Sequence, residues 1–306
     1  MNKAYCVLVI FTIIISVTPL VSAQISFGEP AEHKSIKIVI DENGQVHVFD
    51  EIRKSTKIVQ VEAIEGTVSN VRVTDIKGND IEYGTVGSGK ITGFTIFPSN
   101  TDVLVEYDLA DVLLLKDNLW AWDFYNVETT TIIFPEGVDL VFVNDRPILL
   151  HDTKGITCYG RSHNSICDAY IEYGINEPTN IEKIQWDNRN FNVGVRTFAD
   201  VSSFNFDQPT KSISFDVNGE RQLITVIIPL ELLWNPYEVY FGDQKILKHE
   251  FFSNGTHAWL NIRPENSGTI HIIGTSVIPE FPLFVPFFLG ISAVILIQLR
   301  NRFNLH

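Results

Sequence analysis

The chain has 306 residues, 45% of them hydrophobic and 20% charged, a balance that excludes an intrinsically disordered protein. The chain has 23 lysines and arginines and 37 aspartates and glutamates, and the resulting net charge of −14 excludes sequence-independent binding to nucleic acid. Three cysteines and one methionine are too few for a four-thiolate zinc site or a methionine-ligated copper site.

Residues 1–23 have the pattern of a secretory signal peptide. Lys3 supplies the positive start, Val7–Val17 is an apolar run, and Val21–Ala23 precedes a cleavage point before Gln24. An uncleaved anchor helix is the alternative. Either way, we expect the chain to be exported.

The region from residue 24 to residue 178 is predicted to form a β-rich domain. Apolar residues alternate with polar ones in Ile36–Ile40 and in Val103–Tyr107, and Asp41–Gly44 has the composition of a turn. Asp108–Asn118 fits either a short helix or a buried strand. The spacing of the runs is typical of a β-sandwich.

An aromatic run follows in this domain. Strand alternation places Trp120, Trp122 and Phe124 on one face. Such a face either stacks on sugar rings, which makes Trp120 and Trp122 a candidate ligand platform, or packs inside the domain core. The sequence leaves both interpretations open.

Cys158 and Cys167 are the cysteines that remain after the signal peptide. In an oxidising exterior they are expected to form a structural disulfide across a short polar loop. A redox-active pair is the alternative, but the spacing lacks the C-x-x-C geometry that tunes thiolates.

A second domain is predicted at residues 188–277, after a change of composition at Asn176–Asn180. It contains about seven short alternating runs, which suit a small sandwich. Asn218–Gly219 marks a hairpin turn, and Pro229–Leu233 can make one helical turn.

Asn254 begins Asn-Gly-Thr, the one N-glycosylation acceptor pattern of the two domains. An Asn-Gly pair is also a common hairpin turn, and turn formation alone explains it.

Catalytic, cofactor and metal sites are not predicted. The eight histidines show no tight zinc spacing, although His151 and His163 lie near the cysteine loop. Neither a nucleophile elbow nor a P-loop occurs, and Gly84–Gly89 fits a flexible hairpin tip.

The C-terminal region is predicted to span a membrane once. Residues 281–299 are almost wholly apolar and long enough to cross a hydrocarbon layer of about 30 Å. Arg300 and Arg302 then place the tail, residues 300–306, in the cytoplasm. A buried core helix is the alternative.

The segment at residues 278–282, Ile-Pro-Glu-Phe-Pro, precedes this run. Pro279, Glu280 and Phe281, with the apolar helix and basic tail, resemble the Pro-Glu-Phe sorting signals of archaeal surface proteins. The resemblance implies processing by an archaeosortase-like membrane transpeptidase, although Pro282 stands where many members have glycine. The second domain, with Ser203–Phe206 and Ile270–Thr275, resembles a β-sandwich module that precedes the membrane tail in such proteins.

These features predict an all-β protein with two sandwich-like ectodomains, a signal peptide and one transmembrane helix. We expect a non-enzymatic cell-surface protein that is structural, adhesive or ligand-presenting and needs no cofactor. Its expected partners are the lipid membrane, an archaeosortase-like enzyme, and a surface glycan or envelope protein. Two alternatives are a membrane-tethered hydrolase of glycan or peptide and a receptor or solute-binding subunit of an envelope complex.

Overall fold

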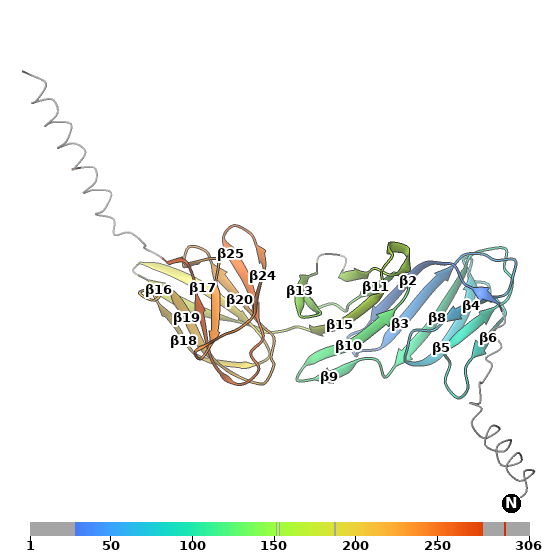
Figure 1. The fold of residues 1–306 in the computed structure, drawn as a ribbon, viewed down its shortest axis with the longest axis horizontal. Helices are drawn as coiled ribbons and strands as arrows, with labels where there is room; N and C mark the ends of the chain where they lie inside the picture. Colours follow the sequence, from blue (N-terminus) through green and yellow to red (C-terminus); the bar gives the residue numbers. More distant parts are fainter. Residues whose placement is uncertain (1–27, 151, 153, 187, 278–290, 292–306) are drawn as a thin grey trace, which may run out of the picture.

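The computed structural model describes residues 28–277, apart from 151, 153 and 187, together with residue 291. This part is all-β, as predicted, and forms two units joined in sequence (Figure 1). Residues 1–23, predicted as a signal peptide, the motif at Pro279, Glu280 and Phe281, and the apolar run 281–299 apart from residue 291 fall outside the described residues. Among the residues that are described, no helix has the length and apolarity needed to cross a membrane.

The first unit contains three sheets. The six-stranded sheet has the order β14 (Gly155–Cys158), β11 (Thr130–Ile133), β2 (His33–Ile40), β3 (Val46–Ile52), β8 (Val103–Ala110), β5 (Thr67–Asp75). The four-stranded sheet has the order β1 (Glu29–Pro30), β4 (Val59–Glu62), β7 (Gly93–Ile96), β6 (Tyr83–Val86). The five-stranded sheet has the order β13 (Arg146–Leu149), β12 (Leu140–Val143), β15 (Cys167–Gly174), β10 (Leu119–Asn126), β9 (Leu114–Lys116).

One hydrophobic core joins the three sheets of the first unit. Ile38 of β2, Phe94 of β7 and Phe124 of β10 are fully buried and belong to the same cluster. Alternation explains this burial, because every second residue of a strand points to the same face. The four-stranded and five-stranded sheets thus pack on the six-stranded sheet through its alternating apolar residues.

The turn predicted at Asp41–Gly44 is present between β2 and β3. The Asp41 carboxylate accepts hydrogen bonds from the backbone N–H groups of Asn43 and Gln45, both at 2.8 Å. Gly44 has φ of +78°, and a Cβ there would lie 2.4 Å from the Trp120 ring. The turn therefore needs glycine both for its backbone conformation and for its contact with Trp120.

The segment 108–118, predicted as a short helix or a buried strand, is not one element: residues 108–110 end β8, with Leu109 buried, and residues 114–116 form β9. β8 continues to Ala110, a turn follows with Asp111 at φ of +61°, and β9 begins at Leu114. Leu114 and Leu115 are exposed, because β9 is an edge strand that pairs only with β10. Apolar side chains are usually buried, but these two are exposed to solvent because their strand lies at the edge of the sheet.

The second unit has two five-stranded sheets and one short strand pair. One sheet has the order β16 (Thr179–Trp186), β17 (Arg189–Arg196), β20 (Ile224–Pro229), β25 (His257–Ile262), β24 (Lys248–Ser253). The other has the order β18 (Asp200–Asp207), β19 (Ser212–Asn218), β26 (Gly268–Ile273), β22 (Glu238–Phe241), β23 (Gln244–Lys245). The pair is β21 (Leu233–Trp234) with β27 (Ser276–Val277).

The second unit starts at Thr179 and not at residue 188. β16 pairs along its whole length with β17, so residues 179–186 form an edge strand of the second unit. The sequence obscured this strand because five of its eight residues are exposed and only Ile184 is buried. The connection between the units is therefore confined to residues 175–178.

The core of the second unit lies between its two five-stranded sheets. Val193 and Val226 from one sheet and Phe215 and Ile272 from the other are fully buried in one cluster. This face-to-face packing is the arrangement that the alternating runs predicted.

A small apolar cluster and several ion pairs hold the two units together. Leu140 and Phe142 of β12 pack with Leu223 of the second unit, and all three side chains are at most 3% exposed. Arg263, which follows β25, donates to Asp145 at 2.6 Å and also to Glu172 of β15. Arg263 and Glu172 are mostly buried in this junction, while Asp145 is exposed at its edge.

Replacement of Leu223 by alanine should weaken this junction. We expect a loss of about 2–5 kcal/mol in unfolding free energy, because a buried leucine is removed from a packed cluster. Urea denaturation should then show the two units unfolding in separate steps. The matched control is Leu247→Ala, since Leu247 of the same unit is 74% exposed and its replacement should change stability by less than about 0.5 kcal/mol. Equal effects of the two substitutions would contradict this role of the cluster.

Candidate ligand-binding cavity

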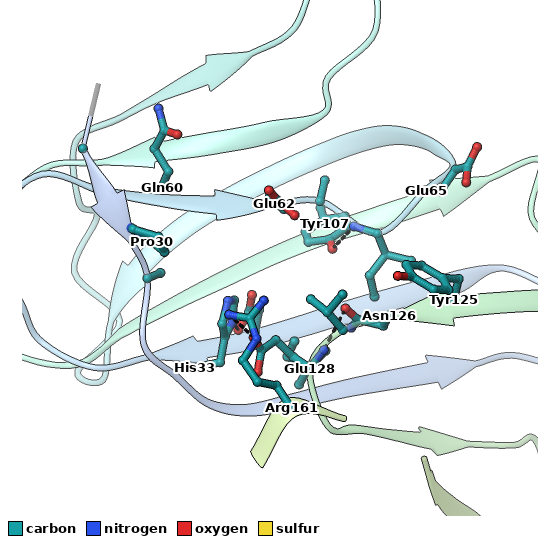
Figure 2. Close-up of a pocket in the computed structure, with 17 residues that line it drawn as sticks. Pro30, His33, Gln60, Glu62, Glu65, Tyr107, Tyr125, Asn126, Glu128 and Arg161 are labelled. Carbon is teal, nitrogen blue, oxygen red and sulfur yellow. Dashed lines mark hydrogen bonds and ion pairs between the residues drawn. The ribbon is translucent and has the colours of Figure 1, made fainter. Parts of the chain in front are cut away.

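A cavity of about 400 Å³ lies in the first unit (Figure 2). Its lining comes from β1 and β4 on one side, from β2, β3 and β8 at its base, and from the loop after β10 on the other side. The cavity therefore lies where the four-stranded and five-stranded sheets approach each other over the six-stranded sheet. The chemically informative lining residues are His33, Asp50, Glu62, Glu65, Tyr107, Tyr125, Glu128 and Arg161.

A buried aspartate and a histidine form the base of the cavity. Nδ1 of His33 and Oδ1 of Asp50 are 2.8 Å apart, and the Asp50 side chain is only 3% exposed. The two residues lie on the paired strands β2 and β3. The carboxylate is buried because Asp50 occupies an inward position of β3, in phase with Val46, Val48 and Ile52.

Burial and the His33–Asp50 hydrogen bond shift the pKa of each residue in opposite directions. Burial raises the pKa of Asp50, although the hydrogen bond and charge of His33 oppose the rise. Burial lowers the pKa of His33, but the hydrogen bond and charge of Asp50 outweigh burial, and the pKa of His33 is raised. The imidazole therefore holds its proton more tightly than an exposed histidine does.

Tyr107 is the second buried polar group of the cavity. Its hydroxyl oxygen accepts a hydrogen bond from the backbone N–H of Ile64 at 3.1 Å, and the residue is 2% exposed. Burial raises the pKa of Tyr107, so the hydroxyl stays protonated at neutral pH. Its own hydrogen is thus available as a donor toward the cavity.

The other wall is fastened by the disulfide between Cys158 and Cys167. The bond, predicted from the sequence, closes the loop that contains the 3-10 turn η1 (Arg161–His163). The backbone N–H of Arg161 donates to the carbonyl of Val127 at 2.7 Å, and a guanidinium nitrogen of Arg161 lies 3.3 Å from the Glu128 carboxylate. The disulfide loop thus positions a positive charge on the cavity wall (Figure 2).

The rim of the cavity is acidic and aromatic. Glu62 ends β4, Glu65 lies in the following turn, and both are exposed. Tyr125 of β10, which is 55% exposed, also lines the cavity, and Figure 2 shows it on the same side as Glu65.

Trp120 and Trp122 do not form the sugar platform that was one interpretation of the sequence. Trp122 is 4% exposed and packs edge-on against Phe124 in the core, with ring centroids 4.9 Å apart. Trp120 is partly buried against the same core and covers Gly44. A ring covered in this way has no face for a ligand, so the core interpretation applies.

Asn254 lies in an exposed turn between β24 and β25, as expected of an Asn-Gly pair. Gly255 has φ of +83°, and the side-chain oxygen Oδ1 of Asn254 accepts hydrogen bonds from the backbone N–H groups of Thr256 and His257. The Asn-Gly-Thr sequence is therefore explained by turn geometry, and glycosylation at Asn254 stays a prediction.

Metal ligands were not expected, and no group of three or more His, Cys, Asp or Glu side chains suited to a metal occurs among the described residues. His163 lies in the disulfide loop, where its ring contacts Tyr159 at a centroid distance of 4.5 Å. His151 is outside the described residues.

The residues that line the cavity were not predicted from the sequence. One signal was present, because Asp50 interrupts an apolar series at Val46, Val48 and Ile52 with a charged side chain. A carboxylate at a core position needs a partner or a function. By contrast, nothing in the sequence places Glu62, Glu128 and Arg161 together, because three separate loops and strands supply them.

Comparisons with known proteins give no family. No family model matches the chain, and no curated protein matches it. Among solved structures, an aminopeptidase N family protein from Idiomarina loihiensis is similar over 51% of this chain and 31% of that chain. The TM-score is 0.35 and the sequence identity is 9%, so the likeness carries no argument about activity.

The His33–Asp50 pair should make stability depend on pH. Since the pKa of His33 in the folded protein lies above its ordinary 6.5, its stabilisation is fully present below pH 6.5 and is lost as pH rises through the raised value. The difference in unfolding free energy between the wild type and His33→Gln should therefore be larger at about pH 5.5 than at about pH 8.5. Urea denaturation at the two pH values measures it.

The control for this measurement is Leu247→Ala, which removes an exposed side chain and no titratable group, so its effect on the unfolding free energy should be the same at both pH values. A pH-independent effect of His33→Gln would contradict the pairing.

Replacement of both Cys158 and Cys167 by serine should lower the unfolding free energy by about 2–3 kcal/mol, because the short loop gains freedom in the unfolded chain. The Arg161 N–H should also exchange its hydrogen faster, since the loop that holds it against Val127 is no longer closed. Hydrogen exchange with mass spectrometry measures this. Reduction of the wild type should reproduce both effects, and reduction of the variant should add nothing.

Proposed function

We propose that this protein is exported and held at the cell surface by its C-terminal apolar run, where its first unit presents a ligand-binding cavity. Its role is binding and display rather than catalysis. The cavity bounded by Asp50, Tyr107 and Arg161 is the observation that carries this proposal, because a concave site with a few converging polar groups is typical of ligand binding.

Export is supported by the disulfide and by the two ends of the sequence. The Cys158–Cys167 bond is of a kind that persists in oxidising compartments. Residues 1–23 have the signal-peptide pattern, and Arg300 and Arg302 follow an apolar run of spanning length. The proposed location is a single-pass membrane protein with both units outside and residues 300–306 inside.

Display is supported by the order of the units. The second unit lies between the first unit and the apolar run along the chain, and it is fastened to the first unit through Phe142, Leu223 and Arg263. It can therefore act as a stiff spacer below the binding unit. The proposed partners are the membrane lipid, an archaeosortase-like enzyme at Pro279–Phe281, and a surface glycan or envelope component.

One observation favours hydrolysis as a second candidate. Burial raises the pKa of Asp50, and Glu62 and Glu128 lie around the same cavity. Pairs of carboxyl groups with separated pKa values carry out glycoside hydrolysis. Turnover of a glycan or peptide that is lost in Asp50→Asn, while the variant stays folded, would favour the enzyme.

Cell fractionation tests the proposed location. The full chain should sediment with membranes, and removal of residues 281–306 should release it into the medium, because the apolar run is the proposed anchor. A protease added to intact cells should digest both units of the anchored form.

A matched control replaces Arg300 and Arg302 by glutamine and keeps the apolar run, so that the protein should stay in the membrane. Recovery of the full chain in the cytosol, resistant to external protease, would overturn the proposal. Mass spectrometry of the released form also reports whether Asn254 carries a glycan and whether the chain is cut near Pro279.

A further inference from the structure

We propose that the cavity of the first unit binds a small organic cation that carries ammonium or guanidinium groups. This inference deepens the proposed function, since it gives the chemical class of the ligand for the same site. The ligand is defined by its positive charge and its small size, and its binding does not depend on where the protein is located.

The charge of the lining favours a cation. Four acidic residues, Asp50, Glu62, Glu65 and Glu128, line the cavity together with Arg161 and His33. Arg161 is paired with Glu128 and His33 with Asp50, so the negative charges of Glu62 and Glu65 remain uncompensated by the cationic groups of the lining. The net charge of −14 adds a field of the same sign.

The base of the cavity offers an acceptor for such a ligand. Oδ1 of Asp50 is bonded to His33, and no hydrogen bond to the other oxygen, Oδ2, occurs within the part of the chain that the structure describes. Oδ2 is not among the fully enclosed side-chain atoms of that part that have no partner, so water or a ligand in the cavity can reach it. An N–H group of a bound cation would satisfy this oxygen and supply a positive charge.

The remaining lining suits the stem and the far end of the cation. Ile36, Ala63 and Ile64 provide apolar surface for a short hydrocarbon chain. Tyr125 of the lining has an exposed aromatic ring, and aromatic faces attract ammonium and guanidinium groups. A volume of about 400 Å³ admits a small molecule and excludes a folded domain.

A series of probes with the same five-carbon chain separates charge from shape. 1,5-Diaminopentane is a dication, 5-aminopentanoate a zwitterion, 1,5-pentanediol neutral and glutarate a dianion. Isothermal titration of the full chain in detergent micelles should give the order dication, zwitterion, diol, dianion, with at least about a tenfold weaker Kd for the diol than for the dication. Equal or tighter binding of glutarate or pentanediol, or no binding of the diamine, would overturn the inference.

A double variant assigns the binding to this cavity. Glu62→Gln with Glu65→Gln removes two exposed charges without altering a core position, and it should weaken diamine binding about tenfold. The matched control, Glu82→Gln with Glu136→Gln, removes two exposed glutamates outside the lining and should leave the Kd unchanged. An equal loss in both double variants would mean that only the general negative field attracts the diamine, and would overturn the site.

A third variant probes the base of the cavity. Asp50→Asn removes the inner charge and should weaken diamine binding further, with circular dichroism to verify the fold. If this variant does not fold, the Glu62 and Glu65 result decides alone. A failure of membrane localisation combined with charge-selective binding would refute the proposed function and leave this inference intact, while the reverse pattern would refute only the inference.

Discussion

The first unit depends on one constraint: a single sheet face has to be covered by two sheets that are not hydrogen-bonded to each other. Ile38 of β2 packs in the same core as Phe94 from one covering sheet and Phe124 from the other. The cavity lies at the border between these two covering sheets, with residues of β2, β3 and β8 at its base.

Asp50 shows how this border is used. A buried carboxylate contributes little to stability, because the cost of removing it from water offsets much of the favourable interaction energy with His33. An apolar residue in phase with Val48 and Ile52 would fill the same position without this cost. The presence of a charge there indicates that the border is organised around a polar ligand or a polar network.

The sequence was sufficient where local chemistry decides. Alternation identified β2 and β8, the turn residues identified the hairpins at Gly44 and Gly255, and the two cysteines identified their disulfide. It failed where a neighbour distant in sequence decides. The exposed edge strand β16 has no apolar pattern. The position of Trp122 in an alternating run fits either a surface or a core residue. The cavity is lined by residues between 28 and 161 that only the order of the strands in the sheets brings together.

The contacts between the units have a mechanical consequence. The chain passes from one unit to the other through residues 175–178, but Phe142 packs on Leu223, and Arg263 bridges to Asp145 and Glu172 at the same junction. A pull on a ligand held in the first unit is therefore shared between covalent backbone and lateral contacts. Shear or tension would load the ion pairs and the apolar cluster before the connecting segment is stretched, which gives the joint a stiffness that four linker residues alone do not provide.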